Sequence, residues 1–312
     1  MATTIIRPKN REEWLEVRKN GIGSSEVATI VGLNPWQTPY QLWRIKTGQD
    51  APKNENFAMK AGHYLEDAVS LFWQDETGRE VIKRSAGDWI IQSDKHPFLQ
   101  VSPDRTYWLG ESRSPSDKGI LECKTTQMPI DGDDIPRHFF CQVQYQLGVS
   151  ELQHGSLAWL VQGRSFGYRD IDFVPDLYAW LEDEATRFWV DCIKGGKEPD
   201  LLNLDDMLIK YRRHAPGRVI EVGDDLLDAY HELKGVKADL DPLLKRKEEL
   251  ETRLKMAFGD AEAIAYGGEI LATFKAPKDS MKFDSKAFAA AHPDLAAEFT
   301  KPAPGARRFL LK

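Results

Sequence analysis

Two short motifs in the middle of the sequence have residue types suited to phosphodiester hydrolysis. Glu122 and Lys124 stand two residues apart in a run that reads as a strand, 119–125, so their side chains project from one face. Asp104 follows Ser102 and Pro103, at the end of another extended run. An antiparallel return through the loop 110–118 would bring Asp104 next to Glu122. Two carboxylates and an ammonium suit the binding of Mg²⁺ and the activation of a water molecule.

Glu66 is a third candidate carboxylate. Apolar residues recur at helical spacing over residues 58–77, and Glu66 shares one stripe of that helix with Val69 and Trp73. A carboxylate on or beside an apolar face needs a compensating cation or hydrogen bonds. This position favours a metal ligand, direct or through water, while the alternative is a glutamate at the edge of the stripe that reaches solvent.

Each motif alone also has a purely structural interpretation. Glu-x-Lys on an exposed strand is usually a solvated face, and an aspartate after proline usually forms a turn. Their joint occurrence, in this order and at this spacing, favours a nuclease.

The segment 18–26 has the features of an anion-binding site. Ser24 and Ser25 open an expected helix whose first backbone N–H groups are free, and Arg18 precedes Ser25 by seven residues. A helix N-terminus together with a guanidinium suits a terminal DNA phosphate. The alternative is a capped helix with a surface arginine.

Three glutamines, Gln142, Gln144 and Gln146, lie in an expected helix over 135–148. Gln142 and Gln146 share one helical face. Amides that face an acidic cluster can bind a phosphate oxygen or a metal-bound water, whereas a plain polar surface is the alternative.

The elements that must position these residues are helices around a small mixed sheet. Helices are expected at 11–18, 24–31, 39–47, 58–77, 135–148 and 175–195, and extended runs at 89–92, 99–102, 105–109, 119–125, 156–161 and 168–174. Helices that flank a central sheet predict an α/β (α+β) core.

The character of the sequence changes after Gly196. We expect a core over 1–200, a polar connector over 201–222 and an appendage over 223–312. The appendage should contain a coiled or hairpin helix interrupted by Pro242, a β-hairpin about Gly267-Gly268, a short helix after Asp284 and a strand-like end at 307–311. Its leucine spacing fits a packed helical subdomain or self-association.

Composition restricts the classes of protein. A net charge of -7 and a pI near 5.6 argue against general coating of nucleic acid, so any DNA contact must be local. The three cysteines form no CxxC pair, so neither a zinc site nor a disulfide framework is indicated. With no apolar run of about 20 residues and no signal-peptide pattern at the start, we expect a cytoplasmic protein without a membrane segment.

Taken together, the motifs resemble those of a known family. Glu66, Ser102-Pro103-Asp104, Glu122-Cys123-Lys124 and Gln142-Val143-Gln144, with the stretch 18–48, are similar to the lambda exonuclease-like (YqaJ-type) viral recombinases. These form a branch of the PD-(D/E)xK nucleases, and the resemblance covers about residues 10–195. It implies a restriction-endonuclease-like core.

The resemblance also implies roles for single residues. Asp104 and Glu122 would bind Mg²⁺ directly, as two ions in the family's manner and with Mn²⁺ as an alternative metal. Glu66 would support the metals or their water, and Lys124 would orient or deprotonate the nucleophile. The residues that match the grip on a terminal 5′-phosphate, or that hold the site together, are Arg18, Ser25, Ser102 and Gln142, with Ser24 and Gln144 as weaker candidates.

The implied activity is processive 5′ to 3′ digestion of one strand of duplex DNA from an end, as in phage-type recombination in a bacterial cell. It leaves a 3′ overhang for a single-strand annealing partner, and the family suggests a homotrimer. Two alternatives stay open at this stage: an endonuclease or nickase on the same core, and a non-catalytic DNA-binding or assembly protein.

Overall fold

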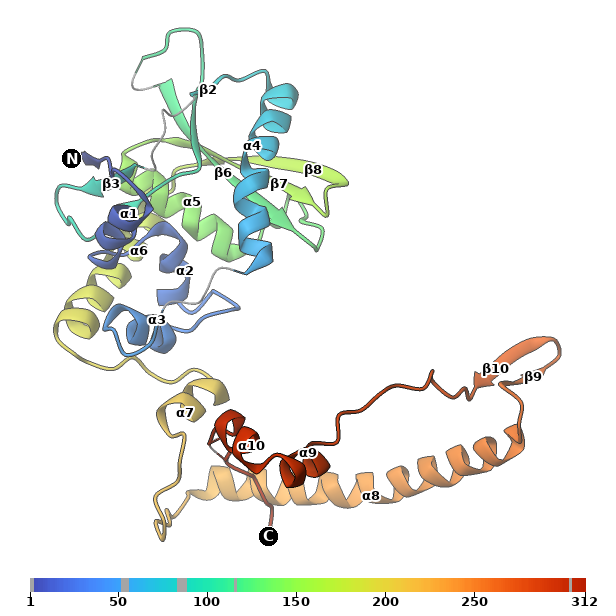
Figure 1. The fold of residues 1–312 in the computed structure, drawn as a ribbon. Helices are drawn as coiled ribbons and strands as arrows, with labels where there is room; N and C mark the ends of the chain where they lie inside the picture. Colours follow the sequence, from blue (N-terminus) through green and yellow to red (C-terminus); the bar gives the residue numbers. More distant parts are fainter. Residues whose placement is uncertain (1–2, 52–55, 83–88, 115–116, 303–304) are drawn as a thin grey trace. The chain divides into compact units, whose positions relative to one another are not determined.

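The computed structural model describes residues 3–51, 56–82, 89–114, 117–302 and 305–312 (Figure 1). It divides into two compact units, Met1–Lys210 and Tyr211–Lys312. The first unit contains a central mixed sheet flanked by helices, which confirms the α/β (α+β) class expected from the sequence.

The central sheet has five strands in the order β2-β5-β6-β7-β8. Their bounds are Val81–Ile82, Arg105–Trp108, Lys118–Thr126, His154–Val161 and Ser165–Asp172. The β6 and β7 strands are parallel, and the other neighbours are antiparallel. Strand β6 is therefore the central strand, with neighbours of both directions.

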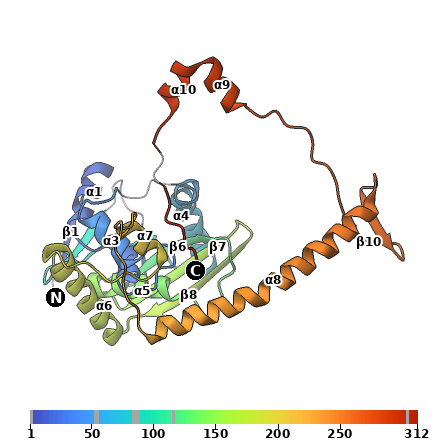
Figure 2. The same ribbon diagram turned by 90° about the horizontal axis from the view of Figure 1, so that it is seen from below.

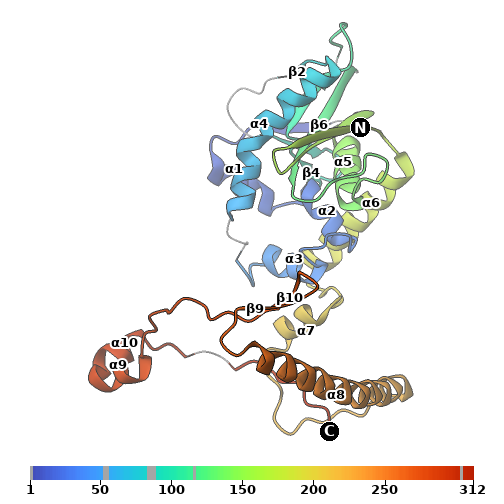
Figure 3. The same cartoon turned by 90° about the vertical axis from the view of Figure 1, so that its right-hand side faces the viewer.

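Helices α4 (Phe57–Thr77) and α5 (Arg137–Ser150) cover opposite faces of this sheet (Figure 3). Val69 and Trp73 of α4 pack with Leu121, whereas Val143 of α5 packs with Ile120. Because side chains alternate along a strand, successive residues of β6 point to different helices. Odd-numbered residues of β6, such as Leu121, therefore face α4, and even-numbered residues, such as Ile120, face α5.

A second, three-stranded antiparallel sheet has the order β1-β3-β4. It consists of Thr3–Ile6, Ile90–Ser93 and Gln100–Val101. The chain passes from this sheet to the central one between β4 and β5, through Ser102-Pro103-Asp104. That short link fixes where Asp104 lies.

Further helices of the first unit are α1 (Arg11–Lys19), α2 (Ser24–Ile30), α3 (Pro39–Lys46) and α6 (Pro175–Arg187). The start of α1 is capped by Asn10, which accepts from the backbone of Glu13, and α3 by Thr38, which accepts from that of Gln41. The sequence predicted both of these helices close to their observed bounds.

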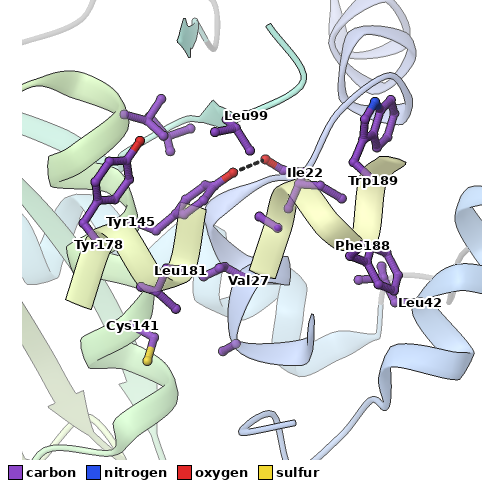
Figure 4. Close-up of a cluster of buried hydrophobic side chains, with 14 of the residues drawn as sticks. Ile22, Val27, Leu42, Leu99, Cys141, Tyr145, Tyr178, Leu181, Phe188 and Trp189 are labelled. Atoms are coloured by element: carbon purple, nitrogen blue, oxygen red, sulfur yellow. Dashed lines mark hydrogen bonds between the residues drawn. The ribbon is translucent and has the colours of Figure 1, made fainter. Parts of the chain in front are cut away.

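A cluster of buried side chains joins α2, α3 and α6 to α5 and to the second sheet (Figure 4). Tyr145 lies fully buried in it, and its hydroxyl donates to the backbone oxygen of Ile22 over 3.2 Å. Val27 and Leu181 belong to the same cluster of buried side chains. The loop before α2 is thereby attached to the core at Ile22.

The end of the first unit differs from the expected connector. Helix α6 continues as a π-helical segment, Phe188–Lys194, and a further helix, α7 (Leu204–Lys210), follows. Buried Asp206 of α7 accepts from the Thr38 hydroxyl over 2.7 Å and from the Gln41 amide over 3.0 Å. These bonds attach α7 to α3, so the unit ends ten residues beyond the position expected from composition.

The second unit is built around α8 (Asp224–Phe258), which runs continuously through Pro242 (Figure 2). Strands β9 (Ala263–Tyr266) and β10 (Glu269–Thr273) form the predicted hairpin, with Gly267 and Gly268 at positive φ. Helix α9 (Ser285–Ala291) follows Asp284 as predicted, while α10 (Pro293–Phe299) was not predicted.

The expected strand at 307–311 is wrong, because these residues pair with no strand among those the structure describes. An apolar run without a neighbouring edge cannot satisfy its backbone as a strand. Within the described ranges, no helix combines the length and the apolar character that a membrane crossing needs.

Candidate active site

A cavity of about 510 Å³ in the first unit contains the four residues in which the sequence predicted the chemistry. They are Glu66 from α4, Asp104 from the link between the two sheets, and Glu122 and Lys124 from β6. The predicted anion-binding residues Arg18, Ser24, Ser25, Ser102 and Gln142 also line this cavity. Segments distant in the sequence therefore meet here, although their roles remain predictions.

Asp104 lies next to β6 because it immediately precedes β5, which begins at Arg105. The two strands pair antiparallel only as far as Arg105 opposite Leu121, which confirms the predicted return through the loop 110–118. Beyond that point Pro103 has no N–H to extend the ladder. The backbone N–H of Cys123 instead donates to the Asp104 carboxylate over 2.7 Å.

Glu122 is almost fully buried, at 2% exposed, and each of its oxygens is hydrogen-bonded. It accepts from Lys124 Nζ over 2.6 Å, from Gln146 Nε2 over 2.7 Å and from the Gln142 amide. Lys124 Nζ also donates to Gln142 Oε1 over 3.1 Å. A buried charge is tolerated only with such partners, so α5 holds the Glu122 carboxylate in one orientation.

The remaining two carboxylates carry unfavourable electrostatics. Burial raises the pKa of Asp104 well above its ordinary value, and the nearby Glu122 and Glu66 raise it further. Burial likewise raises the pKa of Glu66, although His63 Nδ1 lies 3.0 Å from its carboxylate and acts in the opposite direction. Three acidic groups are thus crowded in a cavity where added positive charge would be stabilising.

Lys124 is held as an ammonium. Burial alone lowers its pKa, but the carboxylates of Glu122 and Asp104 raise it by more, so the pKa lies above the ordinary lysine value. A lysine in this state donates hydrogen bonds and does not accept a proton. The surroundings therefore favour an orienting role over that of a general base.

The donor types suit a divalent cation, since carboxylate oxygens are the ligands that Mg²⁺ prefers. The raised pKa of both Asp104 and Glu66 supports this fit. Over the described part of the chain, however, no three Asp, Glu, His or Cys side chains are oriented as a ligand cluster. Glu122 is turned to Lys124 and the glutamines, and Glu66 to His63.

The residues predicted to bind an anion lie around Gly23, which has no side chain. Arg18 Nη2 lies 3.3 Å from Ser25 Oγ, and the guanidinium also stacks over the Trp14 ring at 4.7 Å. A Cβ at Gly23 would lie 2.4 Å from the same Nη2. Because real Cβ atoms do not approach that closely, any larger residue at position 23 would make the Arg18 guanidinium shift.

Lys46 holds the loop that carries these groups, and no sequence pattern indicated this role. Its side chain is 6% exposed, and Nζ donates to the backbone oxygens of Arg18 over 3.1 Å and Gly21 over 2.7 Å. The same Nζ pairs with Glu26 over 2.9 Å, and Glu26 accepts from the Gly23 N–H. Charge-assisted bonds of this kind fix the turn before α2.

The other predicted residues divide between the cavity and its surroundings. Ser102 Oγ donates to the Trp89 backbone over 2.8 Å, and Ser24 Oγ accepts from Gln146 over 3.2 Å. Gln144 faces away from the cavity: its amide donates to the Asp172 backbone and accepts from that of Val174, both over 2.8 Å. Gln146, and not Gln144, lies beside Gln142 at the Glu122 carboxylate. Its spacing of four residues from Gln142 places both on one helical face, and this is the sequence signal that could have identified it.

Comparison of the sequence with known proteins identifies the family of this chain. Residues 13–153 match the model of the YqaJ-like viral recombinase domain. The uncharacterized protein YqaJ of Bacillus subtilis (strain 168) is 31% identical over 316 aligned residues, which cover 97% of this chain and 94% of that protein. The chain therefore belongs to the YqaJ-like viral recombinase family.

More distant likenesses were also found. The uncharacterized protein R354 of Acanthamoeba polyphaga mimivirus is 24% identical over 152 residues, or 45% of this chain and 27% of that protein. The solved alkaline exonuclease LHK-Exo of Laribacter hongkongensis, in complex with dAMP, is 18% identical at a TM-score of 0.46 and covers 64% of this chain and 97% of that one. A phage-related exonuclease from Haemophilus somnus 129PT is 11% identical at a TM-score of 0.42, over 57% and 96% of the two chains.

Proposed function

We propose that this protein is a metal-dependent deoxyribonuclease that digests one strand of duplex DNA from its 5′ end and leaves a 3′ overhang, in phage-type recombination. The observation that carries the proposal is the meeting of Glu66, Asp104, Glu122 and Lys124 in one cavity. Membership of a viral recombinase family supports a DNA substrate.

In this proposal Asp104 and Glu122 hold Mg²⁺, with Mn²⁺ as an alternative, and Glu66 supports the ion directly or through water. A bound ion would neutralise charge on the scissile phosphate and lower the pKa of the attacking water. Lys124, whose ammonium lies 2.6 Å from the Glu122 carboxylate, would donate a hydrogen bond that orients this water. Gln142 and Gln146 keep the Glu122 carboxylate in place.

The preference for a 5′ end of DNA is assigned to the residues predicted to bind a phosphate. Arg18, at the end of α1, and Ser25, at the start of α2, would bind the terminal 5′-phosphate, with Ser102 and Gln142 bordering the same space. A guanidinium bound to the end phosphate sets the scissile bond at a fixed distance from it. The overall charge of -7 agrees with such local recognition of DNA.

The test is digestion of linear duplex DNA labelled separately at each end, with and without a 5′-phosphate and with and without Mg²⁺. We expect nucleotides to leave from the 5′ ends only, faster with the phosphate, and none to leave without the metal. Cutting of closed circular duplex as fast as linear duplex would instead identify an endonuclease or nickase. No release of nucleotides with either Mg²⁺ or Mn²⁺ would identify a non-catalytic DNA-binding protein.

Further parts of the proposal concern partners. The 3′ strand that the reaction exposes requires a protein that anneals single strands, and the family resemblance suggests that three copies of the nuclease unit form a ring. Both stay predictions, as does a cytoplasmic location. Pull-down with an annealing protein and mass measurement of the isolated chain would test them.

A further inference from the structure

Helix α8 carries an apolar stripe that repeats every seven residues. Counting from Leu226, the first and fourth positions of five successive heptads are all apolar except one. In order they are Leu226, Ala229, Leu233, Val236, Leu240, Leu243, Lys247, Leu250, Leu254 and Ala257, and we call them the α8 stripe. Apolar residues at these two heptad positions are the pattern of helices that pack along their whole length against another helix.

The α8 stripe is exposed within the structure. Its larger apolar members range from 39% exposed at Leu233 to 65% at Leu243. The helix has 35 residues, so the stripe is about 50 Å long. The other helices described in this unit, α9 and α10, have seven residues each and are too short to cover it.

Features that weaken the helix lie away from the stripe. Gly235 and Pro242 are seven residues apart, so both occupy the third heptad position, on the outer side. Proline removes one helical hydrogen bond and bends a helix. At this position it does so without interrupting the apolar repeat.

The charges beside the stripe change sign along the helix. The residues that precede each first position are Asp225, Glu232 and Asp239 in the first half, and Arg246 and Arg253 in the second. In an antiparallel pair of identical helices these flanks face each other, so the acidic half of one lies against the basic half of the other. The flank is therefore complementary to a reversed copy of itself.

One antiparallel register satisfies the stripe and the flank together. If Leu240 packs against the partner's Leu243, Asp239 lies opposite the partner's Arg246, and Glu232 opposite the partner's Arg253. This register also pairs Leu226 with the partner's Ala257, so the two helices overlap from end to end. Its centre falls between Asp241 and Pro242, the middle of α8.

The single polar member of the stripe points to the same orientation. In a parallel pair, Lys247 would meet the partner's Lys247 in the apolar seam, and like charges so placed repel. In the antiparallel register it meets the partner's Val236 instead.

We propose that α8 binds α8 of a second copy of this chain as an antiparallel two-helix coiled coil.

The first test removes the apolar contact. Sedimentation velocity on the full chain compares the wild type with the double variant Leu240→Glu and Leu243→Glu, and we expect the variant to have half the wild-type mass. The matched control, Ala238→Glu and Thr252→Glu, adds the same two charges at the outer sixth heptad position and should keep the wild-type mass. Because all four side chains are exposed, circular dichroism should show folded protein throughout.

The second test fixes the orientation. The charge variants Glu232→Arg/Asp239→Arg and Arg246→Glu/Arg253→Glu should each sediment at half the wild-type mass, and their equimolar mixture should return to the full mass. In a parallel pair the mixture would not recover, since an arginine at 232 would face the partner's Lys237. Failure of the mixture to recover therefore overturns the antiparallel arrangement.

Three other outcomes overturn the proposal. They are a wild-type chain that sediments as a single copy at high micromolar concentration, an assembly whose mass the leucine variant does not change, and a trimer that the leucine variant reduces to single chains. None of these outcomes depends on nuclease activity, so the test is independent of the proposed function.

Discussion

The active-site cavity and α8 distribute polar and apolar side chains in opposite ways. In the cavity, charged groups such as Glu122 are buried and held by neighbours in the same unit. Along α8, leucines such as Leu243 face solvent. Buried charges with complete partners indicate a site whose orientation is fixed before any ligand binds, whereas a long exposed apolar stripe indicates a surface completed by another molecule. Substitutions in the cavity should therefore affect nuclease activity, whereas substitutions along α8 should affect association with another molecule.

The largest expected effect is on chemistry in the cavity. Lys124→Ala and Asp104→Ala should each lower the rate of nucleotide release from linear duplex DNA by about a thousandfold or more, because each removes a group placed to stabilise or orient the reacting atoms. Asp104→Ala should also abolish any effect of Mg²⁺ on DNA binding.

The matched control for Lys124→Ala is Lys118→Ala, at the other end of β6 and absent from the cavity lining. It should keep wild-type turnover. Near-normal turnover in Lys124→Ala or Asp104→Ala would refute the assignment of the site.

The second prediction compares one leucine from each region. Leu121→Ala, in the fully buried face of β6, should lower the free energy of unfolding by about 3 kcal/mol, because it leaves a cavity in the core. Leu243→Ala, made in the Glu232→Arg/Asp239→Arg background where α8 is expected to be unpaired, should change it by less than about 0.5 kcal/mol. Chemical denaturation measures both. Equal losses would show that α8 is buried within its own chain.

The smallest expected effect concerns end recognition. Gly23→Ala should displace the Arg18 guanidinium and lower the preference for 5′-phosphorylated ends about tenfold, which corresponds to about 1.4 kcal/mol. The matched control is Gly62→Ala in α4, where a Cβ would lie an ordinary 3.6 Å from Thr125 Oγ1. Rates on ends with and without phosphate give the preference. An unchanged preference in Gly23→Ala would remove Arg18 from the site.

The sequence predicted the placement of the candidate site residues correctly where the residues of a single strand or helix follow a regular spacing. The alternation along β6 placed Glu122 and Lys124 on one face, and the loop after β5 implied the antiparallel return that brings Asp104 alongside. Helical spacing also predicted that Gln142 and Gln146 share a face, although Gln144 was kept as a candidate in place of Gln146.

Contacts between distant elements left no such pattern. Lys46 acts on a turn more than twenty residues earlier in the chain, and no local periodicity connects them. Asp206 lies in a polar stretch that read as a connector, yet it is buried by bonds to Thr38 and Gln41. The strand expected at 307–311 failed for the converse reason: an apolar run predicts a strand only if another strand is available to pair with it.

The amide hydrogens of Gln142 and Gln146 offer a way to observe the cavity without any substrate. Each group donates to the Glu122 carboxylate, and both side chains are at least nine-tenths buried, so their hydrogens should exchange slowly with deuterated water. Their side-chain signals in nuclear magnetic resonance would then report directly on Glu122. A titration with Mg²⁺ that shifts these two signals, and leaves that of Gln144 in place, would locate the ion by spectroscopy alone.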